Sequence, residues 1–96
     1  MTPEAKIKKK VREILLSTST YYVMPHGAGY GNAGAPDFII CLQGKFIGIE
    51  CKAKGNKPTA LQLKNLADIE QCGGYAMVID ETNVDYFPRK LQELMQ

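Results

Sequence analysis

The sequence predicts a small α/β domain with a mixed sheet, in the order α-β-β-β-α-β-α. Three observations carry this prediction: a helical apolar period in the first 18 residues, two β-branched runs around a Gln-Gly turn, and a third apolar run, YAMVID, after a Gly-Gly stop. Alternating helical and strand periods indicate helices packed on a sheet. Ninety-six residues, 45% of them hydrophobic and 23% charged, suit one globular domain spanning residues 1–96.

The first helix is predicted over residues 3–18, with Thr2 as N-cap and Pro3 in the first turn. Its apolar residues share one face: Ile7, Val11, Ile14 and Leu15. Glu4 falls on that same face when the helix is drawn at 100° per residue. It is either an exposed first-turn acid favoured by the helix dipole or a carboxylate that reaches a site beside the helix.

A strand is predicted over residues 20–24, followed by a glycine-rich loop, HGAGYGNAGAP, and a hairpin of strands 37–42 and 45–53. A two-residue loop at 43–44 pairs Leu42 with Lys45, so Ile40 meets Ile47 and Asp37 lies opposite Glu50. Opposed residues point to the same face, and alternation adds Lys52 to it.

Two carboxylates directly opposite each other weaken a strand pair unless a cation binds both. A hard divalent cation such as Mg²⁺ or Mn²⁺ satisfies such a pair and keeps coordination positions open for a phosphate. The alternative is purely structural: Asp37 caps the loop after Pro36, while Glu50 and Lys52 form a solvated pair at the sheet edge.

A second helix is predicted over about residues 59–72, ending at Gly73-Gly74. Gln62 projects between its apolar residues Leu66 and Ile69, and a buried amide needs partners. It would bond the sheet backbone, or else orient a lysine or a phosphate. A short buried strand follows at 75–80. The last helix becomes regular near Pro88 and carries one apolar face: Val84, Phe87, Leu91, Leu94 and Met95.

Composition excludes several classes of protein. The three cysteines show no C-x-x-C spacing, and Cys41 and Cys51 lie in strand runs, which predicts reduced and buried thiols. One histidine makes a structural zinc site implausible. The sequence has no run of about 18 apolar residues, so no membrane span is expected. The N-terminal sequence lacks the apolar core of a signal peptide, so a cytoplasmic protein is expected, in the host cell if it is viral.

The ordered polar residues resemble a known nuclease signature. PD at 36–37, followed after a short hairpin by ECK at 50–52, is similar to the PD-(D/E)xK motif. The first-helix glutamate Glu4, the approach GNAGAPD, the segment KAKGNKPTALQ with Gln62 and the ending GGYAMVI together resemble the VRR-NUC branch, in the stand-alone form that bacteriophages carry. The resemblance covers Glu4 to about Ile79 and implies a restriction-endonuclease-like core.

The resemblance implies a role for each matching residue. Asp37, Glu50 and the backbone carbonyl of Cys51 would bind the metal, and Glu4 would complete the acidic cluster directly or through water. Lys52 would position and polarise the attacking water, while Gln62 would brace the site or the scissile phosphate. A cysteine in the middle of ExK departs from the usual aliphatic residue, but only its carbonyl is needed.

These residues predict a Mg²⁺- or Mn²⁺-dependent endonuclease acting on DNA, without a small-molecule cofactor. The sequence contains no zinc finger or helix-turn-helix pattern that would read bases, so structure-selective cutting is expected. The stand-alone forms that the chain resembles are similar to dimeric resolvases of Holliday junctions, so the resemblance implies a homodimer that acts on branched DNA. A nonspecific or flap-type endonuclease and a non-catalytic DNA-binding accessory protein are the alternatives. Phosphate contacts are expected from basic residues on the first helix and beyond the site: Lys8, Lys9, Arg12, Lys54 and Lys57.

Overall fold

The computed structural model describes residues 1–26 and 33–96. Its helices are α1 (Pro3–Ser17), α2 (Ala60–Gln71), the 3₁₀ turn η1 (Val84–Tyr86) and α3 (Phe87–Leu94). Its strands are β1 (Tyr21–Val23), β2 (Phe38–Leu42), β3 (Lys45–Cys51) and β4 (Tyr75–Ile79). The predicted order of elements is therefore confirmed, with boundaries within about two residues of those expected.

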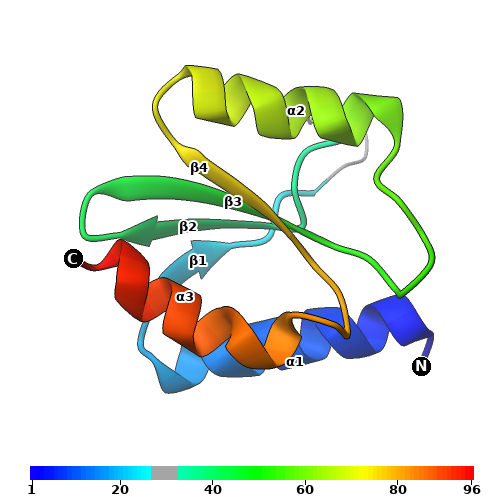
Figure 1. Cartoon of the computed structure of the whole chain (residues 1–96), viewed down its shortest axis with the longest axis horizontal. Coiled ribbons are helices and arrows are strands. Elements are labelled where there is room, and N and C mark those ends of the chain that lie inside the picture. The colour runs from blue at the N-terminus through cyan, green and yellow to red at the C-terminus, as the bar shows by residue number, and fades with distance from the viewer. Residues whose placement is uncertain (27–32) are drawn as a thin grey trace.

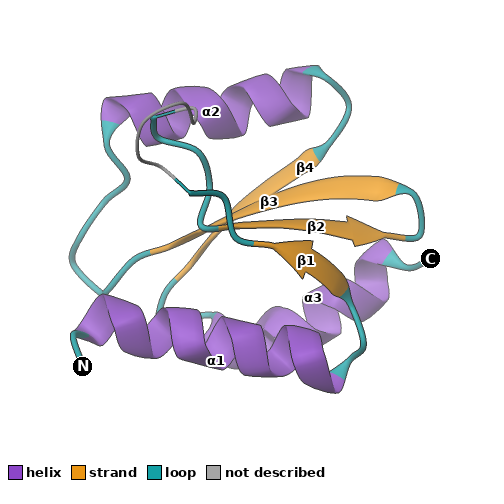
Figure 2. Ribbon diagram, turned by 180° about the vertical axis from the view of Figure 1, so that it is seen from behind, coloured by secondary structure: helices purple, strands orange, loops and turns teal. Residues whose placement is uncertain are grey.

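The four strands form one mixed sheet between two layers of helices. Strand order is β1-β2-β3-β4, antiparallel from β1 to β3 and parallel between β3 and β4. Helix α2 covers one face, and α1 and α3 cover the other (Figures 1 and 2). The parallel pair requires a crossover, and α2 supplies it.

The hairpin register is the one that the sequence predicts. Leu42 pairs with Lys45, Ile40 with Ile47 and Ile39 with Gly48. Gln43 and Gly44 both have positive φ angles, 50° and 80°, as a type I′ turn requires. Because the turn fixes the register, the residues just beyond the Phe38–Ile49 pair, Asp37 and Glu50, come to face each other at the open end of the hairpin.

The main core lies between the sheet and helices α1 and α3. Alternate residues of β2 and β3 point into it, and the α1 stripe of Ile7, Val11 and Leu15 packs against them. The opposite face is thinner. There Gly48 leaves room for Ile69 of α2, since a Cβ at this position would lie 2.6 Å from the Ile69 Cδ1 atom. The lack of a side chain at Gly48 therefore allows α2 to pack on the sheet and has no direct role at the acidic pair.

Three burial predictions were wrong. Cys41 is exposed because it points to the α2 face at a place that α2 does not cover, although Cys51 is buried as expected. The strand over 75–80 is the sheet edge, and only its last residue, Ile79, is buried. Met95 follows the end of α3 and is 43% exposed, so it leaves the apolar face of that helix.

The C-terminal segment begins with η1 and becomes an α-helix at Phe87, with Pro88 in its first turn, as predicted. The glycine-rich loop prediction falls mainly on residues 27–32, which lie outside the described residues. None of the helices in the described ranges combines the length and apolarity that a membrane crossing requires.

Candidate functional site

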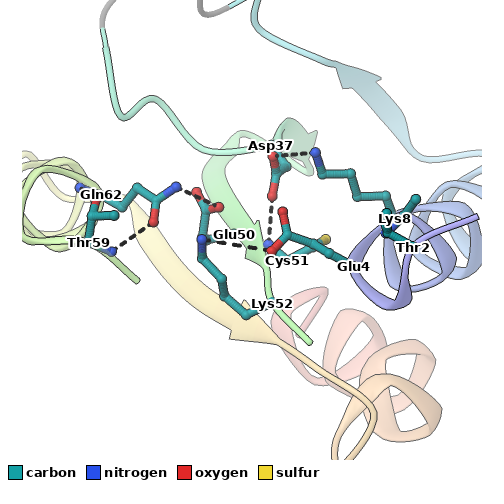
Figure 3. A network of polar contacts seen from close by, with 10 residues as sticks. Thr2, Glu4, Lys8, Asp37, Glu50, Cys51, Lys52, Thr59 and Gln62 are labelled. Carbon is teal, nitrogen blue, oxygen red and sulfur yellow. Dashed lines mark hydrogen bonds and ion pairs between the residues drawn. The ribbon is translucent and has the colours of Figure 1, made fainter. Parts of the chain in front are cut away.

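Asp37 and Glu50 meet at the open end of the β2–β3 hairpin, where their side chains lie near Glu4 of α1 (Figure 3). The Asp37 side chain is 18% exposed, and its Oδ2 accepts a hydrogen bond of 2.8 Å from the backbone N–H of Cys51. This bond continues the hairpin one step beyond its last regular pair. The predicted juxtaposition of the two acids is therefore present, with Asp37 fixed by the backbone of β3.

Glu50 is an almost fully buried acid, with 1% of its surface exposed. Its Oε2 accepts a hydrogen bond of 3.2 Å from Nε2 of Gln62, but within the described residues its Oε1 has no partner. Burial and, to a smaller extent, the nearby Asp37 carboxylate together raise the pKa of Glu50 to about 8, although the Lys52 ammonium acts to lower it. A carboxylate in this position is stabilised either by a proton or by a cation.

Lys52 and Glu4 form the other charged pair of the site. The Lys52 N–H donates to the Ile79 carbonyl at 2.9 Å, which extends the parallel pairing of β3 with β4. Its Nζ lies 3.8 Å from Oε1 of Glu4, and its side chain is 12% exposed. Figure 3 shows the Lys52 ammonium group between Glu50 and Glu4. Lys52 therefore shares a face with Glu50, as the strand alternation predicts.

Gln62 is held by the first turn of α2. Thr59 and Gln62 form a capping box, in which Thr59 N–H donates to Gln62 Oε1 at 2.8 Å and Gln62 N–H donates to Thr59 Oγ1 at 3.2 Å. The amide nitrogen of Gln62 is thereby turned toward Glu50. In this structure Gln62 bonds to a site carboxylate, rather than to the sheet backbone or a lysine. Its expected role in bracing the site or the scissile phosphate stays a prediction.

The predicted DNA-contacting residues lie in two regions. Lys8, Lys9 and Arg12 line a hollow of about 340 Å³ on α1, and Arg12 Nε donates to the Tyr22 hydroxyl at 3.1 Å. Lys54 and Lys57 are exposed in the segment between β3 and α2. The backbone N–H of Lys54 is bound to Glu81 Oε1 at 2.8 Å, so the start of that segment is anchored to the turn after β4.

Two features of the site were missed in the sequence. Lys8 Nζ lies 3.2 Å from Asp37 Oδ1, which places this lysine at the site itself. The signal was its position one helical turn after Glu4, on the same face of α1. The second feature is the Thr59 cap, which the pattern T-x-x-Q at 59–62 indicates.

The donors around the unpartnered Glu50 oxygen suit a hard cation. Asp37 and Glu50 supply carboxylate oxygens, and the Cys51 carbonyl is the predicted third donor. Across residues 1–26 and 33–96, no group of three or more His, Cys, Asp or Glu side chains is arranged to hold a metal ion. Glu4 instead pairs with Lys52. In the described residues the set is thus a pair of acids, and a hard cation bound there would need further oxygen ligands such as the Cys51 carbonyl or water.

Comparisons with known proteins agree with this architecture. A solved structure described as "VRR_NUC domain" matches 99% of this chain and 96% of that chain, with a TM-score of 0.72 and 21% identity. "Putative nuclease p44" of Acyrthosiphon pisum secondary endosymbiont phage 1 is 40% identical over 55 residues, which cover 56% of this chain and 59% of that protein. The match thus spans less than two thirds of that relative. No family model matches the chain. The chain therefore has the fold of the VRR_NUC domain, the family that its sequence resembles.

Proposed function

We propose that this chain, which has the VRR_NUC fold, is a metal-dependent endonuclease that hydrolyses phosphodiester bonds in DNA. One observation carries the proposal: a buried glutamate, Glu50, lies beside a second acid, Asp37, and one of its oxygens has no partner in the described residues. Such a pair repels DNA unless a cation neutralises it. The likeness to a phage protein named as a nuclease supports the same reading.

In this proposal Asp37, Glu50 and the Cys51 carbonyl hold Mg²⁺ or Mn²⁺, and Glu4 contributes directly or through water. A bound ion would activate water and stabilise the charge that develops on the phosphate. Gln62 fixes the Glu50 carboxylate from the α2 side through its 3.2 Å bond. Asp37 is fixed from the β3 side by the Cys51 N–H. The acids are therefore preorganised before a ligand arrives.

Lys52 is assigned to the attacking water and the developing phosphate charge. Its backbone is part of the β3–β4 pairing, so its Cα is held, while four flexible bonds let its ammonium move away from Glu4. The pairing with Glu4 keeps the ammonium near the acids without fixing it on Glu50. Glu4 then acts as a positioning residue for Lys52 as well as a metal ligand, directly or through water.

The decisive experiment compares cleavage by the wild type and by Asp37→Ala, Glu50→Ala and Lys52→Ala, each with Mg²⁺, Mn²⁺ or EDTA. Cleavage is expected only with metal and is expected to be lost in all three variants, while circular dichroism shows them folded. Glu13→Gln is the matched control, because it removes an exposed acid from α1 away from the site. An Asp37→Ala protein that cuts at the wild-type rate would contradict the proposal.

We further propose that the substrate is branched DNA, such as a Holliday junction, and that a homodimer makes paired incisions. Support comes from the family resemblance and from the lack of any base-reading motif in the sequence. Junction, flap and duplex substrates separate the alternatives. Paired cuts confined to the junction favour a resolvase, cutting of every substrate favours a nonspecific enzyme, and binding without cuts favours an accessory protein. Light scattering measures whether the protein is a dimer.

A further inference from the structure

The two lysines at the site differ in the strength of their ion pairs. Lys8 Nζ is 3.2 Å from Asp37 Oδ1, whereas Lys52 Nζ is 3.8 Å from Glu4 Oε1. Asp37 therefore has a counter-ion in the absence of metal, and that counter-ion is Lys8.

Lys8 also belongs to the basic hollow on α1. Together with Lys9 and Arg12 it lines the 340 Å³ hollow, whose other walls are Met1, Ala5 and Met24. Lys8 and Arg12 are one helical turn apart and so share a face. The side chain of Lys8 is 37% exposed, which leaves its ammonium able to turn from Asp37 toward solvent. Lys8 lines the hollow and also pairs with Asp37, so it links the hollow to the acidic pair. Figure 3 shows its contact with Asp37.

The charges at the site make Lys8 a competitor for any cation that uses Asp37. Asp37 is compensated by the Lys8 ammonium at 3.2 Å and by the Cys51 N–H, whereas Glu50 accepts a bond from the Gln62 amide and is near Lys52, whose ammonium pairs with Glu4. A divalent cation shared by the two acids would cancel both charges and remove the attraction that holds Lys8. The lysine would then be an unpaired positive charge at the edge of a hollow already lined by two more.

We propose that Lys8 exchanges partners: it neutralises Asp37 in the metal-free protein and contacts a DNA phosphate in the hollow once a cation occupies Asp37. This inference rests on the proposed function, because it assumes that Asp37 binds metal. It assigns Lys8 a role different from the other basic residues of α1. Those side chains contact phosphate with or without metal, whereas Lys8 does so only when metal is bound.

The first test measures uptake of Mn²⁺ by calorimetry, without DNA, in the wild type, Lys8→Gln and Lys8→Arg. Lys8→Gln removes the competing charge and is expected to bind the ion about two- to fivefold more tightly, the size of one partly exposed ion pair. Lys8→Arg keeps the charge and is expected to restore the wild-type affinity. Lys10→Gln, at an exposed position of the same helix, is the matched control and should not change it.

The second test measures binding of a labelled four-way junction in a Lys52→Gln background, which prevents cleavage. Adding Lys8→Gln is expected to weaken binding at least twofold more with Mg²⁺ than with EDTA. Adding Lys10→Gln should have the same effect in both conditions. A phosphate contact made only with metal also predicts that Lys8→Gln lowers the salt dependence of binding with Mg²⁺ and leaves it unchanged with EDTA.

The outcomes separate this inference from the function on which it rests. If Lys8→Gln takes up Mn²⁺ no more tightly than the wild type, or weakens DNA binding equally with Mg²⁺ and EDTA, partner exchange is wrong while the nuclease proposal stands. If the wild type takes up no cation, both are wrong. Tighter cation binding together with a metal-dependent loss of DNA affinity establishes the exchange.

Discussion

The Glu50 side chain is 1% exposed and lies beside a second acid, so its ionisation opposes folding when no cation is present. Its pKa is about 8 in the folded chain, against an ordinary value of 4.5. Below pH 4.5 both folded and unfolded states carry the proton. Between about pH 4.5 and 8 the unfolded state releases it and the folded state does not, so the free energy of unfolding falls as pH rises.

Glu50→Gln removes this titration and is expected to be more stable than the wild type at pH 8 in EDTA. The advantage should vanish near pH 4.5 and grow with pH by at most about 1.4 kcal/mol per unit, the limit for one proton. Urea unfolding at three pH values measures it. Glu13→Gln, at an exposed site, should follow the wild-type profile. A constant difference between Glu50→Gln and the wild type across this range would contradict the assignment.

The three thiols differ in environment and should differ in reactivity. Cys51 is buried, and burial together with the charges of Asp37 and Glu50 raises the pKa of its thiol. Because the thiolate is the reactive form, Cys51 should be inert in the folded protein. Cys41 and Cys72 are exposed.

We expect a thiol-specific disulfide reagent to modify two cysteines rapidly and the third only after denaturation. Cys51→Ser should leave the rapid phase unchanged, whereas Cys41→Ser should reduce it to one thiol. Rapid reaction of all three thiols in the native protein would show that the open end of β3 is accessible, contrary to the burial seen here.

At the scale of elements, the first turn of α2 links helix stability to the position of a site residue. Thr59 caps the helix, and the Gln62 side chain accepts a hydrogen bond from the Thr59 N–H while its Nε2 donates to Glu50. Thr59→Ala removes one side of this box and is expected to lower the free energy of unfolding by about 1 kcal/mol. Thr59→Ser keeps the hydroxyl and should have nearly the wild-type stability.

The same cap should also affect the rate of DNA cleavage. Thr59→Ala removes the hydroxyl that accepts from the Gln62 backbone N–H but keeps the residue 59 backbone N–H that donates to Gln62 Oε1. The Gln62 amide therefore keeps a partner, and cleavage should fall less than in Gln62→Ala. Single-turnover rates on the preferred DNA, at saturating metal, make the comparison. If Thr59→Ala and Gln62→Ala lose the same activity, the cap would be essential to the position of the amide. If neither loses any, Gln62 has no part in the chemistry.

The elements also show what a single sequence can and cannot predict. The hairpin register follows from alternation and a turn whose two residues adopt positive φ, so the meeting of Asp37 and Glu50 was predictable. The exposure of Cys41 was not, because it depends on where α2 ends over the sheet. The ion pair of Lys8 with Asp37 joins α1 to the start of β2, and helical spacing alone could place Lys8 beside Glu4 but not beside a strand.

At the scale of the whole molecule, helices on opposite faces of the sheet supply the same site. Helix α1 brings Glu4 and Lys8 from one side, and α2 brings Gln62 from the other, to the open end of the hairpin (Figure 3). Each helix is anchored by apolar residues elsewhere along its length. Binding a ligand at this end therefore couples to the packing of both layers and should stabilise the entire fold.

Because of that coupling, cation binding should raise the free energy of unfolding of the whole chain. Mg²⁺ or Mn²⁺ at about tenfold over its dissociation constant should raise the free energy of unfolding by about 1.4 kcal/mol. In a chain of this size that corresponds to a rise in Tm of several degrees. The rise should be larger at pH 8 than at pH 5, because protons compete for Glu50, whose pKa is about 8. Differential scanning fluorimetry with EDTA reversal measures it. Asp37→Asn should lose the rise and Glu13→Gln should keep it; an equal rise in both would place the cation away from the paired acids.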